Sequence, residues 1–204
     1  MLPSSNDCSN VSPTRPIYSI LDYMATRRII RMGHPLLREV ARPLEPGEVG
    51  GLEIERLLED MVDTLHDYGG IGLAAPQIGE SVRLAIVEIP GGATRYGELA
   101  PMSLGVFINP VIDVIDPAPA GYWEGCLSVP GLRGYVERPQ HIKVSYTSED
   151  GHTHEVELTG FPATVFQHEF DHLDGKLYLD RVTDTRLVAF EHEYERYLSP
   201  QVED

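Results

Sequence analysis

Hydrophobic residues recur every three or four positions between residues 53 and 68, which is the pattern of an amphipathic helix. This apolar stripe comprises Ile54, Leu57, Leu58, Met61, Val62 and Leu65. The spacing predicts a helix from Glu53 to Tyr68 with one face against a core. Gly69-Gly70 follows directly, and we expect it to end the helix, because glycine readily adopts the left-handed backbone found at helix C-termini.

Strands are predicted where β-branched residues cluster or where apolar and polar residues alternate. The predicted strands are an initial strand at Arg27–Met32 leading into the loop at His34-Pro35, then Val82–Ile89, Val106–Val114, and two runs at residues 142–146 and 156–158. Asp150-Gly151 separates the last two runs, so we expect a hairpin there. The Gly-, Pro- and Ala-rich stretch from Pro90 to Pro101 is interpreted as a loop.

Two further helices are predicted in the last quarter of the chain. One starts near Pro162, since proline is tolerated in a first helical turn, and ends at Gly175. Its apolar stripe is Ala163, Phe166, Phe170 and Leu173. The other covers about Asp184 to Leu198, with Leu187, Phe190, Tyr194 and Leu198 on one side. Strands and helices do not alternate as βαβ units, so the prediction is an α+β fold, with mixed or antiparallel strands packed around a central helix and a C-terminal helix beyond it.

The composition narrows the function classes. Sixteen basic and 32 acidic residues give a net charge of −16, and no basic run is present, which argues against nucleic-acid binding. No apolar run is long enough to predict a membrane span. The two cysteines suggest a reducing compartment rather than a disulfide framework. Residues 1–24 are interpreted as a flexible leader, with Met24 as an alternative natural start, and residues 25–204 as one catalytic domain.

The strongest chemical signal is His168-Glu169-Phe170-Asp171-His172. Residues four apart lie above one another on a helix, so both imidazoles can bind one ion with Glu169 beside it as a base. A catalytic ion needs a third protein ligand and an open position for water. A downstream Glu191 or Glu193 would make the site resemble a zinc protease, whereas an upstream Cys126 would make a different site.

Cys126 lies in the segment Glu124-Gly125-Cys126-Leu127-Ser128, where the glycine allows close backbone approach. A third unusual segment is Gly70-Ile71-Gly72-Leu73-Ala74-Ala75-Pro76-Gln77, whose small residues also let another chain approach. The three segments, in this order and spacing, resemble the signature motifs of peptide deformylases. The resemblance extends from about Arg27 to Arg181.

The resemblance implies an enzyme that removes the formyl group from the N-terminal formyl-methionine of new proteins. Cys126, His168 and His172 would then hold one divalent ion, with iron(II) as the usual native metal and zinc or nickel as substitutes. Glu169 would take a proton from the attacking water and pass it to the leaving amine. The amide of Gln77 and the backbone N–H of Leu127 would stabilise the oxyanion.

Substrate contacts follow in part from the family and in part from spacing. The family pairs its peptide with a sheet edge, here at Ile71, Gly72 and Gly125. The spacing before His168 gives three candidates for the methionine pocket, Phe161, Thr164 and Val165. Arg133 is a candidate contact with the rest of the peptide, and a plain surface arginine is the alternative.

The partners expected from the resemblance are formyl-methionyl nascent peptides in a bacterial-type cytoplasm. The acidic C-terminal segment does not support ribosome docking through a basic helix. The longer stretch between the first two motifs suggests a variant active-site loop. Two other classes stay open, namely a zinc endopeptidase, and a binding or structural protein with a Cys-His-His metal clip.

Overall fold

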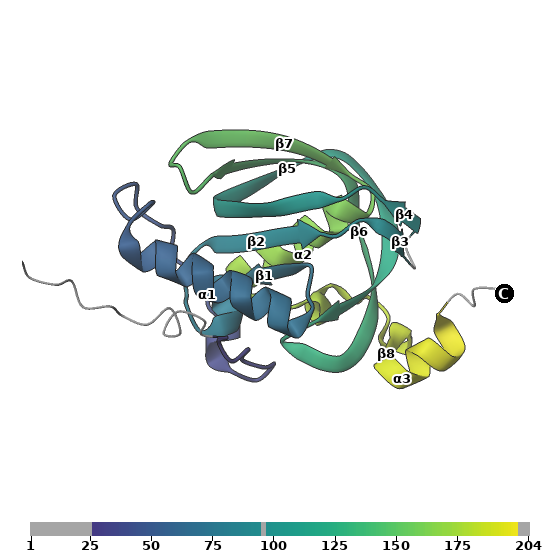
Figure 1. The fold of residues 1–204 in the computed structure, drawn as a ribbon. Helices are drawn as coiled ribbons and strands as arrows, with labels where there is room; N and C mark the ends of the chain where they lie inside the picture. The colour runs from purple at the N-terminus through teal and green to yellow at the C-terminus, as the bar shows by residue number, and fades with distance from the viewer. Residues whose placement is uncertain (1–25, 95–96, 200–204) are drawn as a thin grey trace, which may run out of the picture.

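The structure is a computed structural model that describes residues 26–94 and 97–199 (Figure 1). Within these ranges, six strands form one antiparallel sheet in the order β1-β2-β5-β6-β7, with β8 paired to β6. The strands are β1 (Gly72–Ala74), β2 (Leu84–Ile89), β5 (Met102–Cys126), β6 (Val129–Thr147), β7 (Thr153–Thr159) and β8 (Val188–Phe190). The mixed fold with an antiparallel sheet agrees with the α+β prediction.

Helix α1 (Leu52–Tyr68) forms where the apolar stripe predicts it. Gly69 caps it in the left-handed conformation, with φ of 66°, as expected for a glycine at this end. Ile54, Met61 and Leu65 of the stripe are buried in one core cluster. Helix α1 therefore packs on the sheet through the face that its sequence marks as apolar.

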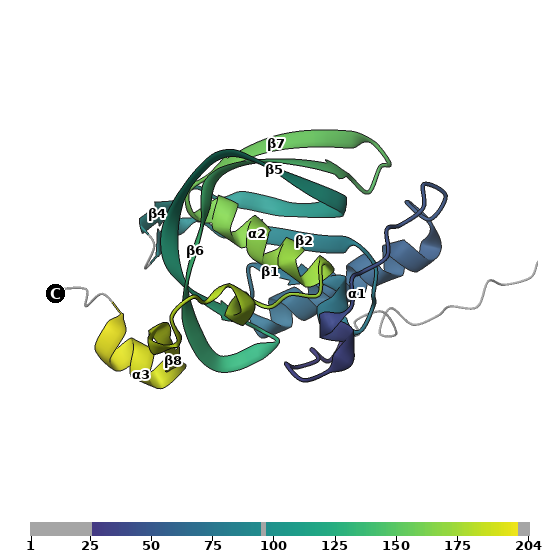
Figure 2. The ribbon, with the colours of Figure 1, turned by 180° about the vertical axis from the view of Figure 1, so that it is seen from behind.

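Strand β2 separates two core layers, because alternate side chains of a strand point to opposite faces. Leu84 and Ile86 belong to the cluster that contains the buried face of α1. Ala85 and Val87 belong to the second cluster, together with residues of helix α2 (Phe161–Leu173). Figure 1 shows α1 in front of β1 and β2, and Figure 2 shows α2 on the other side, within the curve of β5, β6 and β7.

Helix α2 starts at the predicted point, with Pro162 in its first turn. Its predicted apolar stripe, Ala163, Phe166, Phe170 and Leu173, is entirely buried in the second cluster. Gly175, at φ of 68°, follows two residues after the helix ends. The hairpin of β6 and β7 also forms around Asp150-Gly151, as predicted.

The predicted helix from Asp184 to Leu198 is wrong. Instead, a 3-10 turn at Thr185–Leu187 leads into β8, which pairs with residues 132–134 of β6. A helical segment follows only at α3 (Glu191–Glu193) and continues as the π-helical turn η6 (Tyr194–Leu198). Of the predicted stripe, Tyr194 is buried while Phe190 remains 69% exposed. Strand pairing thus overrides the helical spacing here.

Other segments differ from the sequence prediction in smaller ways. Residues 27–32 form no regular strand, although three of their backbone N–H groups bond to other segments. The predicted loop from Pro90 to Pro101 contains a small hairpin of β3 (Gly92–Thr94) and β4 (Gly97–Leu99). The predicted leader, residues 1–24, lies outside the described residues. Among the described helices, none has the length and apolarity needed to span a membrane.

Candidate metal centre and active site

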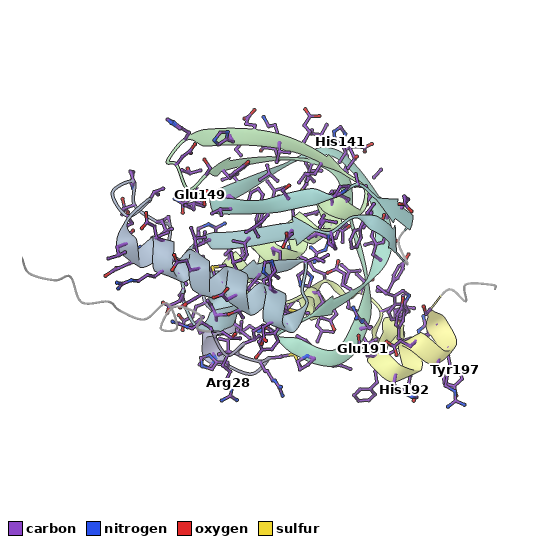
Figure 3. All side chains as sticks on the ribbon, viewed as in Figure 1. Arg28, His141, Glu149, Glu191, His192 and Tyr197 are labelled. Carbon is purple, nitrogen blue, oxygen red and sulfur yellow. The ribbon has the colours of Figure 1, made fainter. Side chains whose placement is uncertain are left out.

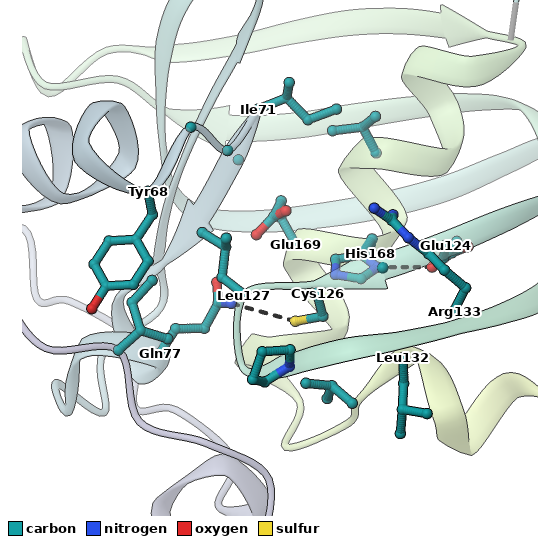
Figure 4. A pocket seen from close by; sticks show the side chains of 18 of the residues that line it. Tyr68, Ile71, Gln77, Glu124, Cys126, Leu127, Leu132, Arg133, His168 and Glu169 are labelled. Atoms are coloured by element: carbon teal, nitrogen blue, oxygen red, sulfur yellow. Dashed lines mark hydrogen bonds and ion pairs between the residues drawn. The ribbon is translucent and has the colours of Figure 1, made fainter. Parts of the chain in front are cut away.

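The three segments singled out in the sequence meet at one pocket of about 560 Å³ (Figure 4). Cys126 is the last residue of β5, and His168 and His172 lie one turn apart on α2. One ligand atom from each of these three residues lies within 4.8 Å of the others. The Cys126 Sγ and the His172 Nε2 are 3.3 Å apart. A divalent ion could therefore contact all three.

The other acidic candidates for a third ligand do not join this group. Within the described residues, the cluster of metal-ligand side chains contains Cys126, His168 and His172 alone. Glu191 instead accepts a hydrogen bond of 3.0 Å from Nε of Arg133. Glu193 lies beside His192, with an oxygen 3.6 Å from Nδ1 of that histidine. The geometry therefore favours the upstream cysteine over a zinc-protease arrangement.

The Cys126 thiol has an unusually low pKa. Burial raises this pKa, but the charge of His172 and the interactions with both imidazoles outweigh burial and lower the pKa to about 5. The sulfur is therefore a thiolate at neutral pH, which is the form that binds a metal ion. Two imidazoles and one thiolate suit iron(II), zinc and nickel alike.

Glu169 is buried next to the candidate ligands, with an exposed fraction of 6%. A Cβ atom on Gly72 would lie 2.5 Å from Oε1 of Glu169, so the carboxyl rests directly against the glycine backbone. Its Oε2 atom is buried and has no hydrogen-bond partner among the described residues. Burial raises the pKa of this carboxyl, which brings it closer to the pH range useful for acid–base catalysis.

Gln77 lies in the 3-10 turn η3 (Ala75–Ile78), with its amide held in one orientation. Its Oε1 accepts a hydrogen bond of 2.8 Å from the backbone N–H of Ala74. Its Nε2 then faces Sγ of Cys126 at 3.6 Å and Oγ of Ser128 at 3.3 Å. The donor end of the amide is therefore directed at the candidate metal centre.

A buried charge network behind His168 was not predicted from the sequence. Glu124 accepts a hydrogen bond of 2.7 Å from Nδ1 of His168 and one of 2.6 Å from Nε of Arg138. Arg138 also donates to Asp171 at 2.8 Å, and Arg181 donates to Asp171 at 2.6 Å. Glu124 and Asp171 lie inside the sequence motifs described above, so their two carboxylates were the feature of the sequence that could have indicated this network.

Arg133 packs against Gly125, and a Cβ atom there would overlap its guanidinium. The same guanidinium pairs with Glu191 from α3. Only 18% of the Arg133 side chain is exposed, so it is more than a plain surface arginine. The C-terminal segment therefore reaches the pocket through this ion pair.

Nearly all residues proposed from the sequence line the pocket, and His172 lies behind them with only 1% of its surface exposed. The pocket-lining ones are Ile71, Gly72, Gln77, Gly125, Cys126, Leu127, Arg133, Phe161, Thr164, Val165, His168 and Glu169. Residues that line it without having been predicted include Arg28, Arg31, Tyr68 and Leu132. These four residues belong to none of the three sequence motifs, so only the fold brings them to the site.

Comparisons with known proteins give the family. The Polypeptide deformylase family profile matches residues 26–187. A peptide deformylase from Leptospira biflexa is 40% identical over 167 residues, covering 82% of this chain and 93% of the relative. The Met-Ala-Ser-bound structure of a class I type b peptide deformylase from Acinetobacter baumannii superposes with a TM-score of 0.73 at 35% identity, covering 78% of this chain and 99% of that one.

A peptide deformylase from Synechococcus elongatus, solved in complex with actinonin, superposes with a TM-score of 0.68 at 32% identity. The superposition covers 80% of that chain and 78% of this one. Sequence profile, relatives and fold agree on the family. This protein belongs to the peptide deformylase family, whose members are metal-dependent hydrolases that remove the formyl group from N-terminal formyl-methionine.

Proposed function

We propose that this chain carries out deformylation at an ion held by Cys126, His168 and His172, on helix α2 as the central element of the fold. The observation that supports this best is the convergence of three ligand atoms within 4.8 Å beside the buried carboxyl of Glu169. A purely structural clip would not need that carboxyl, and it usually has four protein ligands. We propose iron(II) as the native metal, with zinc or nickel as alternatives.

The residues present suit such an ion. The Cys126 pKa of about 5 supplies a thiolate, and the imidazoles of His168 and His172 supply two neutral nitrogen ligands when an ion binds. The unpartnered Oε2 of Glu169 would find a hydrogen-bond partner in a water molecule at the same place. When bound, the ion would lower the pKa of such a water towards neutrality.

Glu169 would act as the base and then as the acid. Its raised pKa lets it take a proton from water and return the proton to the nitrogen that leaves. Gly72 holds the carboxyl close to the sheet edge, because it leaves no side chain in that space. The carboxyl therefore needs little movement between the two proton transfers.

Gln77 and Leu127 would bind the negative charge that develops on the formyl oxygen. The Gln77 amide is already oriented by the Ala74 N–H, so its N–H donors need not be reorganised during the reaction. The second donor would be the Leu127 backbone N–H, in the turn between β5 and β6. Such donors are each worth on the order of 10²–10³ in rate.

The peptide would pair with Ile71, Gly72 and Gly125, because β1 is the edge strand of the sheet and could extend it by one strand. We propose Phe161, Thr164 and Val165 as the methionine pocket. The Thr164 hydroxyl already accepts a hydrogen bond of 3.2 Å from Gln140, which leaves its methyl group for apolar contact. Arg133 would bind the peptide further along.

The physiological substrates would be formyl-methionyl nascent peptides in the cytoplasm. The solved relative that holds Met-Ala-Ser supports binding of a peptide that starts with methionine. Ribosome docking through a basic C-terminal helix is not part of the proposal, because α3 and η6 contain Glu191, Glu193 and Glu195.

An anaerobic assay for formate from a formyl-Met tripeptide, with metal analysis of the same sample, tests the proposal. We expect stoichiometric metal and formate release. Glu169→Ala should keep the metal and lose turnover, whereas Cys126→Ser should lose the metal. Wild-type turnover in Glu169→Ala would rule out this base. Cleavage of internal peptide bonds, with metal retained in Cys126→Ser, would instead support an endopeptidase.

A further inference from the structure

Two arginines at the pocket have no partner. Arg28 and Arg31, here called the rim arginines, line the pocket and are exposed. Neither guanidinium forms a hydrogen bond or an ion pair with any residue that the structure describes. Arg133, in contrast, lines the same pocket but is paired with Glu191. The rim arginines are therefore charges that the protein itself leaves unneutralised at this site.

The backbone fixes the rim arginines beside the reacting centre. The N–H of Ile30 donates to the carbonyl of Gln77 at 2.9 Å, and the N–H of Met32 donates to the carbonyl of Ser128 at 2.8 Å. Ile29 is 4% exposed and belongs to the core cluster that contains α1. This segment thus links the 3-10 turn that carries Gln77 to the turn that follows Cys126. Figure 3 shows Arg28 projecting from it at the outer surface of the molecule.

Every carboxylate that lines the pocket is paired or buried. Glu124 is paired with Arg138, and Glu191 with Arg133. Glu169 is buried and lies against Gly72. The rim therefore has a positive excess, although the whole chain carries a charge of −16. A charged rim above a pocket with partly apolar walls concentrates the electrostatic field and attracts ligand groups of the opposite charge.

We propose that the rim arginines give this enzyme a preference for formyl-methionine peptides with a carboxylate side chain in the residues after methionine. The inference rests on the proposed function and adds a substrate class to it. An extended peptide that pairs with β1 has side chains that alternate between two sides, so one of the two residues after methionine faces the rim. The arginines act on binding, and the proton transfers stay with Glu169.

Binding of unformylated peptides tests this without turnover. We would titrate the metal-loaded protein calorimetrically with C-terminally amidated Met-Glu-Ser, Met-Gln-Ser and Met-Lys-Ser. A second series of amidated tripeptides would carry Glu, Gln or Lys as the third residue instead of the second. In one series or the other, we expect the Glu peptide to bind more tightly than the Lys peptide by about two- to five-fold for each arginine. The preference should shrink between ~0.05 M and ~0.5 M salt, because exposed charges are screened.

Matched variants identify the source of any preference. Arg28→Gln and Arg31→Gln should each move the Glu-to-Lys ratio towards one, while Arg28→Lys and Arg31→Lys should largely keep it. Arg56→Gln is the control, because Arg56 is also exposed, lies outside the pocket and changes the net charge equally. A ratio that Arg56→Gln changes as much as the rim variants would overturn the proposal, because it would then reflect net charge.

The outcomes separate this inference from the proposed function. Peptides that bind with no charge preference in either series would refute the inference, whether or not formate is released. A charge preference that depends on the rim arginines, without formate release from any formyl peptide, would refute the function and leave these arginines as a binding site for acidic side chains. The same peptides with free C-terminal acids complete the set. If they bind more tightly through the rim arginines while the amidated peptides show no Glu-to-Lys preference, the arginines bind a peptide terminus, which contradicts the proposal for a side chain.

Discussion

Substitution of Gly72 by alanine would test whether the position of the Glu169 carboxyl determines the rate. The new Cβ would lie 2.5 Å from Oε1, 2.6 Å from Cδ and 2.7 Å from Cγ of Glu169. Non-bonded carbon atoms prefer separations of about 3.5–4.0 Å, so the end of the side chain must move by about 1 Å. Gly72 does not have a positive φ, so its backbone accepts alanine and the displacement falls on Glu169.

Two effects of Gly72→Ala can be estimated separately. Overpacking of this kind costs about 1–3 kcal/mol of folding stability. A well-placed acid–base group contributes about 10²–10⁴ in rate, and a displaced carboxyl loses much of that. We therefore expect kcat/KM for a formyl-Met peptide to fall by about 10²-fold or more. The metal content should not change, because the three atoms nearest to the new methyl group all belong to Glu169.

The assay combines formate release, metal analysis and thermal unfolding on the same preparations. Gly47→Ala is the matched control, since a Cβ atom there meets nothing within 4 Å and its φ is not positive. Wild-type kcat/KM in Gly72→Ala would show that the position of Glu169 does not limit the reaction. Lost activity together with lost metal would also contradict the reasoning, because the perturbation would then act through the ligands.

Charged groups outside the reacting centre should also have measurable effects. Arg138→Leu removes the buried arginine shared by Glu124 and Asp171, which keep only His168 and Arg181 as partners, and should cost about 3–5 kcal/mol in the free energy of unfolding by urea. The Glu48 carboxyl should titrate by NMR with a pKa of about 2, because Arg42 and a backbone N–H donate to it. This pair then stabilises the fold above pH 4.5 and loses its effect as the pH falls through 2, and Arg42→Ala should return the pKa towards 4.5. Glu191→Gln frees the Arg133 guanidinium and should strengthen any preference for acidic peptides in the calorimetric series.

Elements whose packing follows a local pattern could be predicted from the sequence. The stripes of α1 and α2 bury the residues that their spacing identifies, and glycine follows each helix near its end. The segment around Phe190 has an equally regular helical spacing, yet it forms β8 against β6. Its partner lies more than fifty residues earlier in the chain, and periodicity contains no information about such long-range pairing.

The residues of the site also divide into those that a local sequence pattern predicts and those that it does not. Cys126, His168, Glu169 and His172 can be found from the sequence because the residue types and spacing themselves define the chemistry. The partners of Arg138 are 14 and 33 residues away, and nothing local marks them as partners. The rim arginines come from a segment without regular structure, so only the backbone bonds to Gln77 and Ser128 reveal where they lie.

The two histidines are held in different ways, which explains why the buried charges behind them matter. His168 bonds through Nδ1 to Glu124, which leaves its other ring nitrogen to face the shared space with Cys126. His172 Nδ1 has no such partner in the described residues, so its orientation depends on packing within α2 and the core. Arg138 joins Glu124 on β5 to Asp171 on α2 and so ties the cysteine-bearing strand to the histidine-bearing helix. The buried ion pairs therefore help to place the cysteine-bearing strand against the histidine-bearing helix, and a change in these pairs should lower metal affinity as well as stability.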